Sequence, residues 1–192
     1  MKNKKFKLFA SLTSLVMVVA VMAVGVWAAT SAQAGITGKV NFTATGVQGS
    51  VAVLEEGTTA SLSGVAFSEG KYVIEQFDLT TSAEDAADGT VAIAYEFADA
   101  NGDGFITGAE AQFTVKIQIA NVGAYAMDYE ITFANNDVVA DKVTAAADAA
   151  TGTVEATTGI KDVVITYTLN GHTGAPITNL DIPTATISLV KA

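Results

Sequence analysis

Apolar and polar residues alternate with a period of two along most of the chain after residue 35. The alternation is clearest in three segments between residues 91 and 133. Their apolar positions are Val91, Ile93, Tyr95 and Phe97, then Phe113, Val115, Ile117 and Ile119, then Tyr125, Met127, Tyr129, Ile131 and Phe133. Because successive side chains of a strand point to opposite faces, this pattern predicts half-buried β-strands.

Similar patterns predict further strands on both sides of this region. They are expected at residues 36–45, 47–54, 71–79, 160–170 and 184–189, with a weaker strand at 61–67. Residues 135–158 are expected to form either short edge strands or a long excursion. Gly46 is predicted to form a turn or bulge, and residues 80–89 and 171–183 are predicted to be loops, with one helical turn at 83–87. A series of about eight to ten short strands predicts an all-β protein, a single antiparallel β-sandwich of jelly-roll or Ig-like type.

The N-terminus has the order of a secretory signal. Lysines at positions 2, 4, 5 and 7 precede an uncharged stretch at 8–29, and the small-residue sequence Ala32-Gln33-Ala34 follows. We therefore expect a signal peptide at 1–34 and one β-sandwich domain at 35–192. The uncharged stretch also reaches the ~20 residues that span a bilayer, so a retained membrane anchor is the alternative. Both readings predict export, to the cell surface or the extracellular space.

The charge of the expected mature chain argues against one class of partner, nucleic acid. Loss of residues 1–34 removes four lysines and no acidic residue, so the formal charge falls from −10 to −14. An acidic surface repels phosphate, and we expect no binding to nucleic acid. The chain has no cysteine, so no disulfide stabilises it. Its acidic residues favour solubility or, more specifically, binding of divalent cations.

A calcium-binding pattern lies between the first two of the three central strands. Within the segment 99–110, oxygen-bearing residues stand at positions one, three, five, nine and twelve, and glycine stands at six. The predicted ligands are Asp99, Asn101, Asp103, the backbone carbonyl of Phe105, Thr107 and Glu110. This is the spacing of an EF-hand loop, in which the glycine permits a sharp bend and the last carboxylate closes the site.

The flanks of this loop are strands and not the helices of an EF-hand. The segment 97–133 instead resembles the D-x-N-x-D-G-x-I loop of bacterial Ig-like surface modules, which precedes a strand and an Asn-x-Gly turn, here Asn121 to Gly123. Without the helix pair of a sensor, calcium would act as a structural clamp. The alternative is a polar hairpin loop that binds no metal.

The end of the signal, Gly25 to Ala34 (GVWAATSAQA), resembles that of the TasA and camelysin family of secreted proteins from Gram-positive bacteria. The acidic, cysteine-free, strand-rich chain is similar as well. The resemblance implies a jelly-roll sandwich, a place in extracellular biofilm-matrix fibres or on the cell surface, and cleavage near Ala28 or Ala29. It also implies that an N-terminal strand completes the sheet of the next subunit. The matching strand here contains Ile36, Val40 and Phe42.

Enzymatic motifs are missing from the sequence. There is no G-x-S-x-G elbow, phosphate-binding loop or H-E-x-x-H helix, and the only histidine is His172. We therefore expect no catalytic residues. The sole tryptophan, Trp27, belongs to the signal, and the other aromatic residues are expected mainly in the core.

The sequence thus predicts an exported structural or adhesive protein, fibre-forming by strand addition and stabilised by calcium. Its partners would be further copies of itself or components of the cell surface and matrix, with membrane contact only through an uncleaved N-terminal helix. The alternative is a monomeric secreted module that binds carbohydrate or a protein partner.

Overall fold

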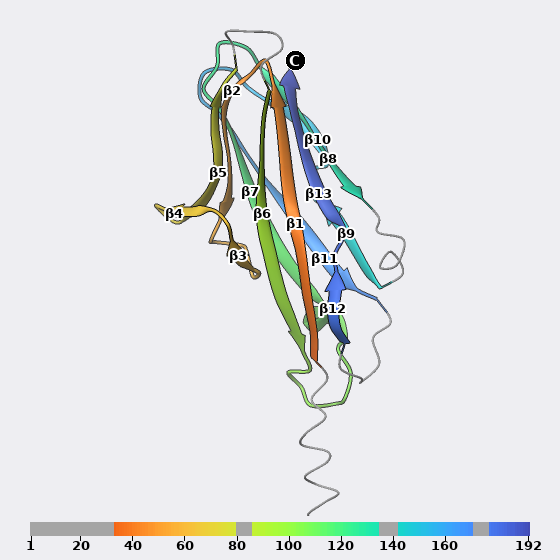
Figure 1. Cartoon of the computed structure of the whole chain (residues 1–192). Helices are drawn as coiled ribbons and strands as arrows, with labels where there is room; N and C mark the ends of the chain where they lie inside the picture. The colour runs from red at the N-terminus through yellow and green to blue at the C-terminus, as the bar shows by residue number, and fades with distance from the viewer. Residues whose placement is uncertain (1–32, 80–85, 135–141, 171–176) are drawn as a thin grey trace, which may run out of the picture.

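A computed structural model describes residues 33–79, 86–134, 142–170 and 177–192. These residues form two facing β-sheets (Figure 1). The strands are β1 (Gln33–Thr45), β2 (Gln48–Leu54), β3 (Ser61–Ser63), β4 (Ala66–Ser68), β5 (Lys71–Asp78), β6 (Ala86–Ala98), β7 (Gln112–Asn121), β8 (Met127–Ala134), β9 (Val143–Ala147), β10 (Thr151–Val154), β11 (Gly159–Leu169), β12 (Ile177–Asp181) and β13 (Thr184–Lys191), and a 3₁₀ turn, η1, spans Gly108–Ala111. The predicted all-β sandwich is confirmed.

The two sheets differ in strand order. The seven-stranded sheet, called sheet A, has the order β10-β8-β13-β1-β6-β3, and β12 pairs with β1 beside β13. The six-stranded sheet, called sheet B, has the order β4-β5-β2-β7-β11-β9. Within the described residues, β1, β6, β8 and β13 thus lie in one layer and β2, β5, β7 and β11 in the other.

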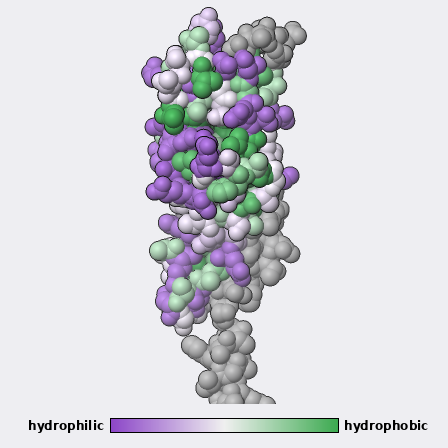
Figure 2. Space-filling model, turned by 90° about the vertical axis from the view of Figure 1, so that its left-hand side faces the viewer, coloured by the Kyte–Doolittle hydropathy of each residue, from purple (hydrophilic) through white to green (hydrophobic). Residues whose placement is uncertain are grey.

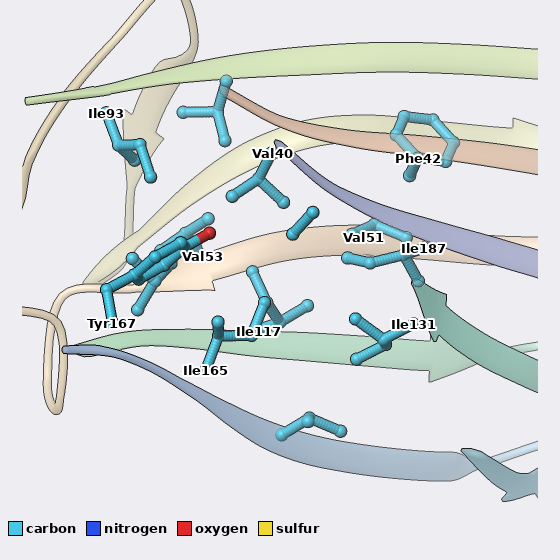
Figure 3. Packing of buried hydrophobic residues seen from close by; sticks show 14 of the residues in the cluster. Val40, Phe42, Val51, Val53, Ile93, Ile117, Ile131, Ile165, Tyr167 and Ile187 are labelled. Atoms are coloured by element: carbon cyan, nitrogen blue, oxygen red, sulfur yellow. The ribbon is translucent and has the colours of Figure 1, made fainter. Parts of the chain in front are cut away.

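The core lies between the layers and follows the alternation seen in the sequence. Side chains from both sheets interdigitate there (Figure 3). Fully buried positions include Val40, Val91 and Ile187 from sheet A and Ile117 and Ile165 from sheet B. The long strands β7, β11 and β13 bury every second residue over most of their length, because one face of each sheet is turned to solvent.

Strand β1 is a central strand of sheet A. It pairs antiparallel with β6 along its whole length, from Gln33 opposite Ala98 to Thr45 opposite Ala86. On its other side it pairs in parallel with β12 and with β13. The prediction of a purely antiparallel sandwich was therefore wrong at this strand. Alternation cannot reveal the direction of a neighbour, because parallel and antiparallel pairing bury the same side chains.

The beginning of β6 corrects a second prediction. Residues 86–89 were expected to be loop, but they pair with residues 42–45 of β1. Gly89 lies against the buried ring of Phe42, and a Cβ built on this glycine would come within 2.3 Å of Phe42 Cε1. A glycine that resembles a turn signal in the sequence thus makes room for an aromatic side chain from the neighbouring strand. The predicted helical turn at 83–87 lies mostly outside the described residues.

Three further predictions differ from the structure. The weak strand at 61–67 is divided into β3 and β4 by Gly64, whose φ is +84°. Part of the expected loop at 171–183 forms β12, since this segment pairs with β1. Tyr125 was expected to face the core, but it lies in the turn before β8 and is 59% exposed. The expected turn at Gly46 and the short edge strands β9 and β10 are confirmed.

The segment from β3 to β4 closes one side of the sandwich. β3 pairs with residues 92–94 of β6 in sheet A, and β4 pairs with residues 71–73 of β5 in sheet B. Phe67 is 52% exposed and lies 4.7 Å, between ring centroids, from Tyr72. Figure 2 looks onto this side and shows apolar and polar residues next to one another over its middle part. The segment from β3 to β4 thus joins an edge of sheet A to an edge of sheet B.

The predicted signal at 1–34 lies outside the described residues except for the first two residues of β1. In the described part of the chain, no helix is long and apolar enough to cross a membrane.

Candidate functional site

The acidic loop at residues 99–110 connects the two sheets. It leaves β6 in sheet A and enters β7 in sheet B through η1, so it is not the hairpin loop of a single sheet (Figure 1). Ile106 and Ala111 anchor it in the core, with exposures of 1% and 4%. The loop therefore spans one end of the sandwich, where its conformation affects how the two sheets are held together.

Hydrogen bonds to Asp99 organise the first half of the loop. Asp99 Oδ1 accepts from the backbone N–H groups of Gly102 (2.7 Å) and Asp103 (3.2 Å), and Oδ2 accepts from that of Gly104 (2.7 Å). Gly102 and Gly104 have φ angles of +73° and +87°, a region that side chains disfavour. The glycine at position six therefore has the bend expected from the calcium-loop pattern, and the carboxylate at position one lies on its concave side.

The other predicted side-chain ligands are held by similar bonds. Asn101 Oδ1 accepts from the N–H of Asp103 (2.8 Å), and Asp103 Oδ1 accepts from the N–H of Phe105 (2.8 Å). Glu110 returns to the start of the loop, where its Oε1 accepts from the N–H of Asn101 (3.0 Å). The loop is thus closed between its third and twelfth positions.

One oxygen in this arrangement is unusual. Glu110 Oε2 is buried and has no hydrogen-bond partner. Burying a carboxylate oxygen without a partner is costly, and a cation is one group that would offset the cost. In the described part of the chain, none of the three carboxylates of Asp99, Asp103 and Glu110 forms an ion pair with a lysine.

The remaining two predicted ligands are Phe105 and Thr107. The ring of Phe105 is 48% exposed and points away from the core, so only its backbone carbonyl would serve a cation. Thr107 precedes η1, and its backbone oxygen accepts from the N–H of Glu110 (3.2 Å). Its side chain makes no capping hydrogen bond.

Among the described residues, no three histidine, aspartate or glutamate side chains gather into a group that would hold a metal ion. The loop nevertheless joins Asp99, Asn101, Asp103 and Glu110 by hydrogen bonds. The predicted set contains three carboxylates, those of Asp99, Asp103 and Glu110, so in this structure they are linked through the loop backbone but do not converge as a metal-binding group. Each carboxylate oxygen that accepts one N–H also keeps a lone pair for a cation.

An aromatic stack lies next to the loop. Phe113, at the start of β7, is stacked between Tyr95 and Tyr167 with centroid distances of 4.7 Å on both sides. Phe97 meets the edges of Tyr95 and Phe113. Offset and edge-to-face contacts of this kind add to the burial of the rings. The acidic loop therefore begins and ends beside a rigid part of the core.

The predicted assembly residues lie in β1, within its own sheet. Val40 and Phe42 are completely buried, and the Phe42 ring is 5.9 Å from that of Phe77 in sheet B. The backbone of Ile36 pairs with Tyr95 on one side and Leu180 on the other. These residues belong to β1 and lie outside the acidic loop at 99–110.

Reasoning from the sequence missed the importance of two other features. Asn121, at 1% exposure, is the only buried polar residue among those described, and the Asn-x-Gly turn pattern was its only signal. A hollow on the outer face of sheet B is lined by residues from three strands or their ends. His172 lies outside the described residues, and the absence of catalytic residues stays a prediction.

No family model matches the chain, and no curated protein matches it. Among solved structures, it is similar to WR4, an MSP family member from C. elegans, with 14% identity over 43% of this chain and 85% of that one and a TM-score of 0.25. SSP-19, an MSP-domain-like protein from Caenorhabditis elegans, has 22% identity over 43% of this chain and 87% of that one, with a TM-score of 0.26. PapD-like domain 7 of human CEP192 has 13% identity over 42% and 72%, with a TM-score of 0.25. These values indicate only a distant likeness among β-sandwich domains.

Proposed function

We propose that this chain is an exported structural or adhesive protein of the bacterial surface or extracellular matrix. In this proposal it assembles into fibres by exchange of the N-terminal strand β1, and calcium in the acidic loop stiffens each subunit. The observation that carries the proposal is the place of β1, which is the first described segment of the chain and yet fills the middle of a sheet.

The surroundings of β1 support exchange of this strand between subunits. Between β6 and β13, β1 occupies a groove that is already complementary to it, with Gly89 opposite the Phe42 ring. The connection to β2 consists of Gly46 and Val47 alone, and Gly46 has a φ of +65° with no atom within 4 Å of a Cβ built on it. Short hinges favour exchange of an element between identical chains. Strand addition would therefore require β1 to leave its own groove and enter that of a neighbour.

The signal pattern and the resemblance to the TasA and camelysin proteins support an extracellular site of assembly. The place of cleavage matters for the mechanism. Cleavage near Ala28 or Ala29 would leave the whole of β1, whereas cleavage after Ala34 would remove its first two residues. The proposal therefore favours the earlier position, with β1 intact in the mature chain. A retained anchor would instead keep the first subunit of a fibre at the membrane.

Calcium would act in this proposal as a clamp between the sheets. Asp99, Asn101, Asp103 and Glu110 would supply side-chain oxygens, and Phe105 its carbonyl, with Thr107 binding directly or through water. The buried, unpartnered Glu110 Oε2 supports this assignment. The cation would neutralise carboxylates that otherwise repel one another, so it would hold β6 and β7 in a fixed relation at this end of the sandwich.

Locking β1 in its own chain tests the assembly mechanism. Thr43 and Asp88 are paired on neighbouring antiparallel strands, at a Cα separation suited to a disulfide. The natural chain has no cysteine, so the double variant Thr43→Cys/Asp88→Cys forms one defined bond. We expect fibres in electron micrographs of the reduced mature protein and none after oxidation, with assembly restored by reductant.

A second disulfide controls for general rigidity. Gln112 and Thr168 are paired between β7 and β11, in sheet B, which does not contain β1. Oxidised Gln112→Cys/Thr168→Cys should assemble as well as the wild type. Fibres from the oxidised Thr43/Asp88 variant would overturn strand exchange, and a wild type that stays monomeric with and without calcium would overturn assembly altogether. The alternative, a monomeric binding module, would then be favoured by the hollow on sheet B.

A further inference from the structure

A hollow of about 400 Å³ opens on the outer face of sheet B, at the end opposite the acidic loop. It is lined by Gln48, Gly49, Ser50, Gln76, Phe77, Asp78 and Val122. This volume lies at the small end of the range of ligand sites, about 300–1,000 Å³. None of these residues belongs to the acidic loop or to β1, so the hollow is separate from the features already assigned.

The strand register explains how the hollow arises. Ser50 in β2 stands between Gln76 in β5 and Ala120 in β7. Ser50 and Ala120 have small side chains and form the floor of the hollow. The side chain of Gln76 is long and exposed and forms one wall. On the next row, Gln48 is paired with Asp78, and its backbone oxygen accepts from the N–H of Val122 (3.1 Å).

The polar side chains of the hollow have hydrogen-bonding capacity to spare. Within the described residues, the side chains of Gln48, Ser50 and Gln76 make no hydrogen bond, ion pair or ring contact. Their two primary amides and one hydroxyl each offer donors and acceptors together. Such groups match a ligand whose own groups also donate and accept, which describes the hydroxyls of a sugar.

The apolar residues beside the hollow also suit a sugar. Val122 is 58% exposed at its rim, and Ile160, 65% exposed, lies on the same outer face because it pairs with Ala120. Ile160 is two strands from Ser50, roughly 10 Å at the usual spacing of strands. An aliphatic ledge beside a set of amides suits a pyranose ring, which has a C–H face and a rim of hydroxyls. The ledge extends far enough for more than one ring.

The charges of the lining and of the whole chain argue against a charged ligand. The lining includes no lysine, and the chain carries a formal charge of −10, so an anionic ligand is repelled. The lining contains a single carboxylate that would attract a cation. Its other polar side chains are two amides and one hydroxyl, and these bind groups that carry no charge. The chemistry therefore favours a neutral ligand.

We propose that this hollow binds neutral oligosaccharide chains, with Gln48, Ser50 and Gln76 as hydrogen-bonding residues and Val122 and Ile160 as the apolar ledge. This inference deepens the adhesive role proposed above, because it gives that role a ligand. It does not depend on strand exchange, since the hollow lies in sheet B and β1 lies in sheet A.

Titration of the isotope-labelled mature protein with cellohexaose and with chitohexaose tests the proposal. Amide NMR shifts should move at residues 48–50, 76–78 and 122, together with the side-chain amides of Gln48 and Gln76. Gln76→Ala removes one or two hydrogen bonds and should weaken binding about three- to tenfold. Ser50→Trp should fill the hollow and abolish binding, while a melting curve like that of the wild type would show that the variant is folded.

Gln112→Ala is the matched control. It removes the same side chain from the same outer face of sheet B, where Gln112 is exposed at the far end of β7 opposite Thr168. Binding to this variant should equal that of the wild type. No shift with either oligosaccharide would overturn the proposal, as would shifts seen only with tetralysine, which would mark a cation site.

The failures of the two proposals are distinguishable. A chain that forms fibres and binds neither oligosaccharide overturns the sugar site alone. A chain that binds a sugar at the hollow and stays monomeric overturns strand exchange and leaves the sugar site standing.

Discussion

The side-chain nitrogen of Asn121 lies 3.0 Å from the backbone oxygen of Val154 and donates a hydrogen bond to it. Because Asn121 ends β7 in sheet B and Val154 ends β10 in sheet A, this bond joins the two sheets. The same amide donates to the oxygen of Tyr125 (2.9 Å) and accepts from the N–H of Gly123 (2.9 Å). One buried side chain thus satisfies three backbone groups of the β7–β8 turn and its neighbour.

Replacing this side chain should be costly. Asn121→Ala leaves two carbonyls and one N–H without their partner, and each unsatisfied buried group costs about 1–3 kcal/mol. We expect the free energy of unfolding to fall by about 3 kcal/mol or more in urea denaturation. Gln118→Ala, which removes an amide from the solvent-facing side of the same strand, should change it by less than about 1 kcal/mol. Equal losses in both variants would contradict the role assigned to Asn121.

Calcium should raise the melting temperature of the mature protein relative to chelator. A ligand that binds only the folded chain stabilises it by about 2.7 kcal/mol at a hundred times its dissociation constant, which corresponds to several degrees for a domain of this size. Asp103→Ala and Glu110→Gln should each remove the difference. The control is Asp88→Asn, a charge change on the exposed side of β6, which should retain it. A wild-type melting curve unaffected by millimolar calcium ends the clamp proposal.

Alkaline pH should unfold the protein through its buried tyrosines. The pKa of Tyr167 is raised because burial disfavours the phenolate, and that of Tyr129 is raised by burial and then by the charge of Asp148. Above pH ~10 the unfolded phenol loses its proton while the folded one keeps it, so stability falls as pH rises. Each tyrosine contributes a slope of up to about 1.4 kcal/mol per pH unit.

Tyr167→Phe separates this effect from other titrations. The Tyr167 hydroxyl is buried and has no hydrogen-bond partner, so removing it should leave stability at pH 7 unchanged or higher. Between pH 10 and 11.5 the variant should lose less stability than the wild type, as measured by urea midpoints. A parallel pH dependence in the two proteins would show that this phenol does not titrate between the folded and unfolded states.

A side chain at position 89 should destabilise the fold, because the Phe42 ring occupies the space beside Gly89. Gly89→Ala places a Cβ against the Phe42 ring and Ile74 Cγ2, and overpacking of this kind costs about 1–3 kcal/mol. Phe42→Leu should recover part of that loss, so a double-mutant cycle would give a favourable coupling energy. Ala94→Gly, the reverse change at an exposed position of β6, controls for changed strand propensity. Additive effects of the two changes would contradict the contact.

Much of the fold follows from residues with strict alternation. Phe113, Val115 and Ile117 are flanked by polar residues, so their burial in strands could be predicted from the chain alone. The start of β6 and the whole of β12 could not, because their pairing is set by β1, which is distant in sequence. Local composition near Gly89 favours a turn, and tertiary pairing overrides it.

The candidate sites also differ in how far the sequence predicts them. The acidic loop is contiguous, so its spacing predicted the bend at Gly104. It also predicted Glu110 as the ligand that closes a calcium site, whereas the bond from the N–H of Asn101 to Glu110 is seen only in the structure. The hollow on sheet B combines residues from positions 48, 76 and 122, and only the strand register brings them together. Exchange of β1 was expected from a resemblance to a family, whereas the groove that this strand fills is visible only in the folded chain.

The parallel arrangement of β1 and β13 has a mechanical consequence. β1 begins at one end of the molecule, and β13 finishes at the other (Figure 1). Tension applied between the two termini therefore acts along the strands, so that β1 and its neighbours resist it in shear. Thirteen residue pairs between β1 and β6 would have to slide together, instead of opening one after another as in a peeled hairpin. A thread built from such subunits would resist stretching best along its own axis.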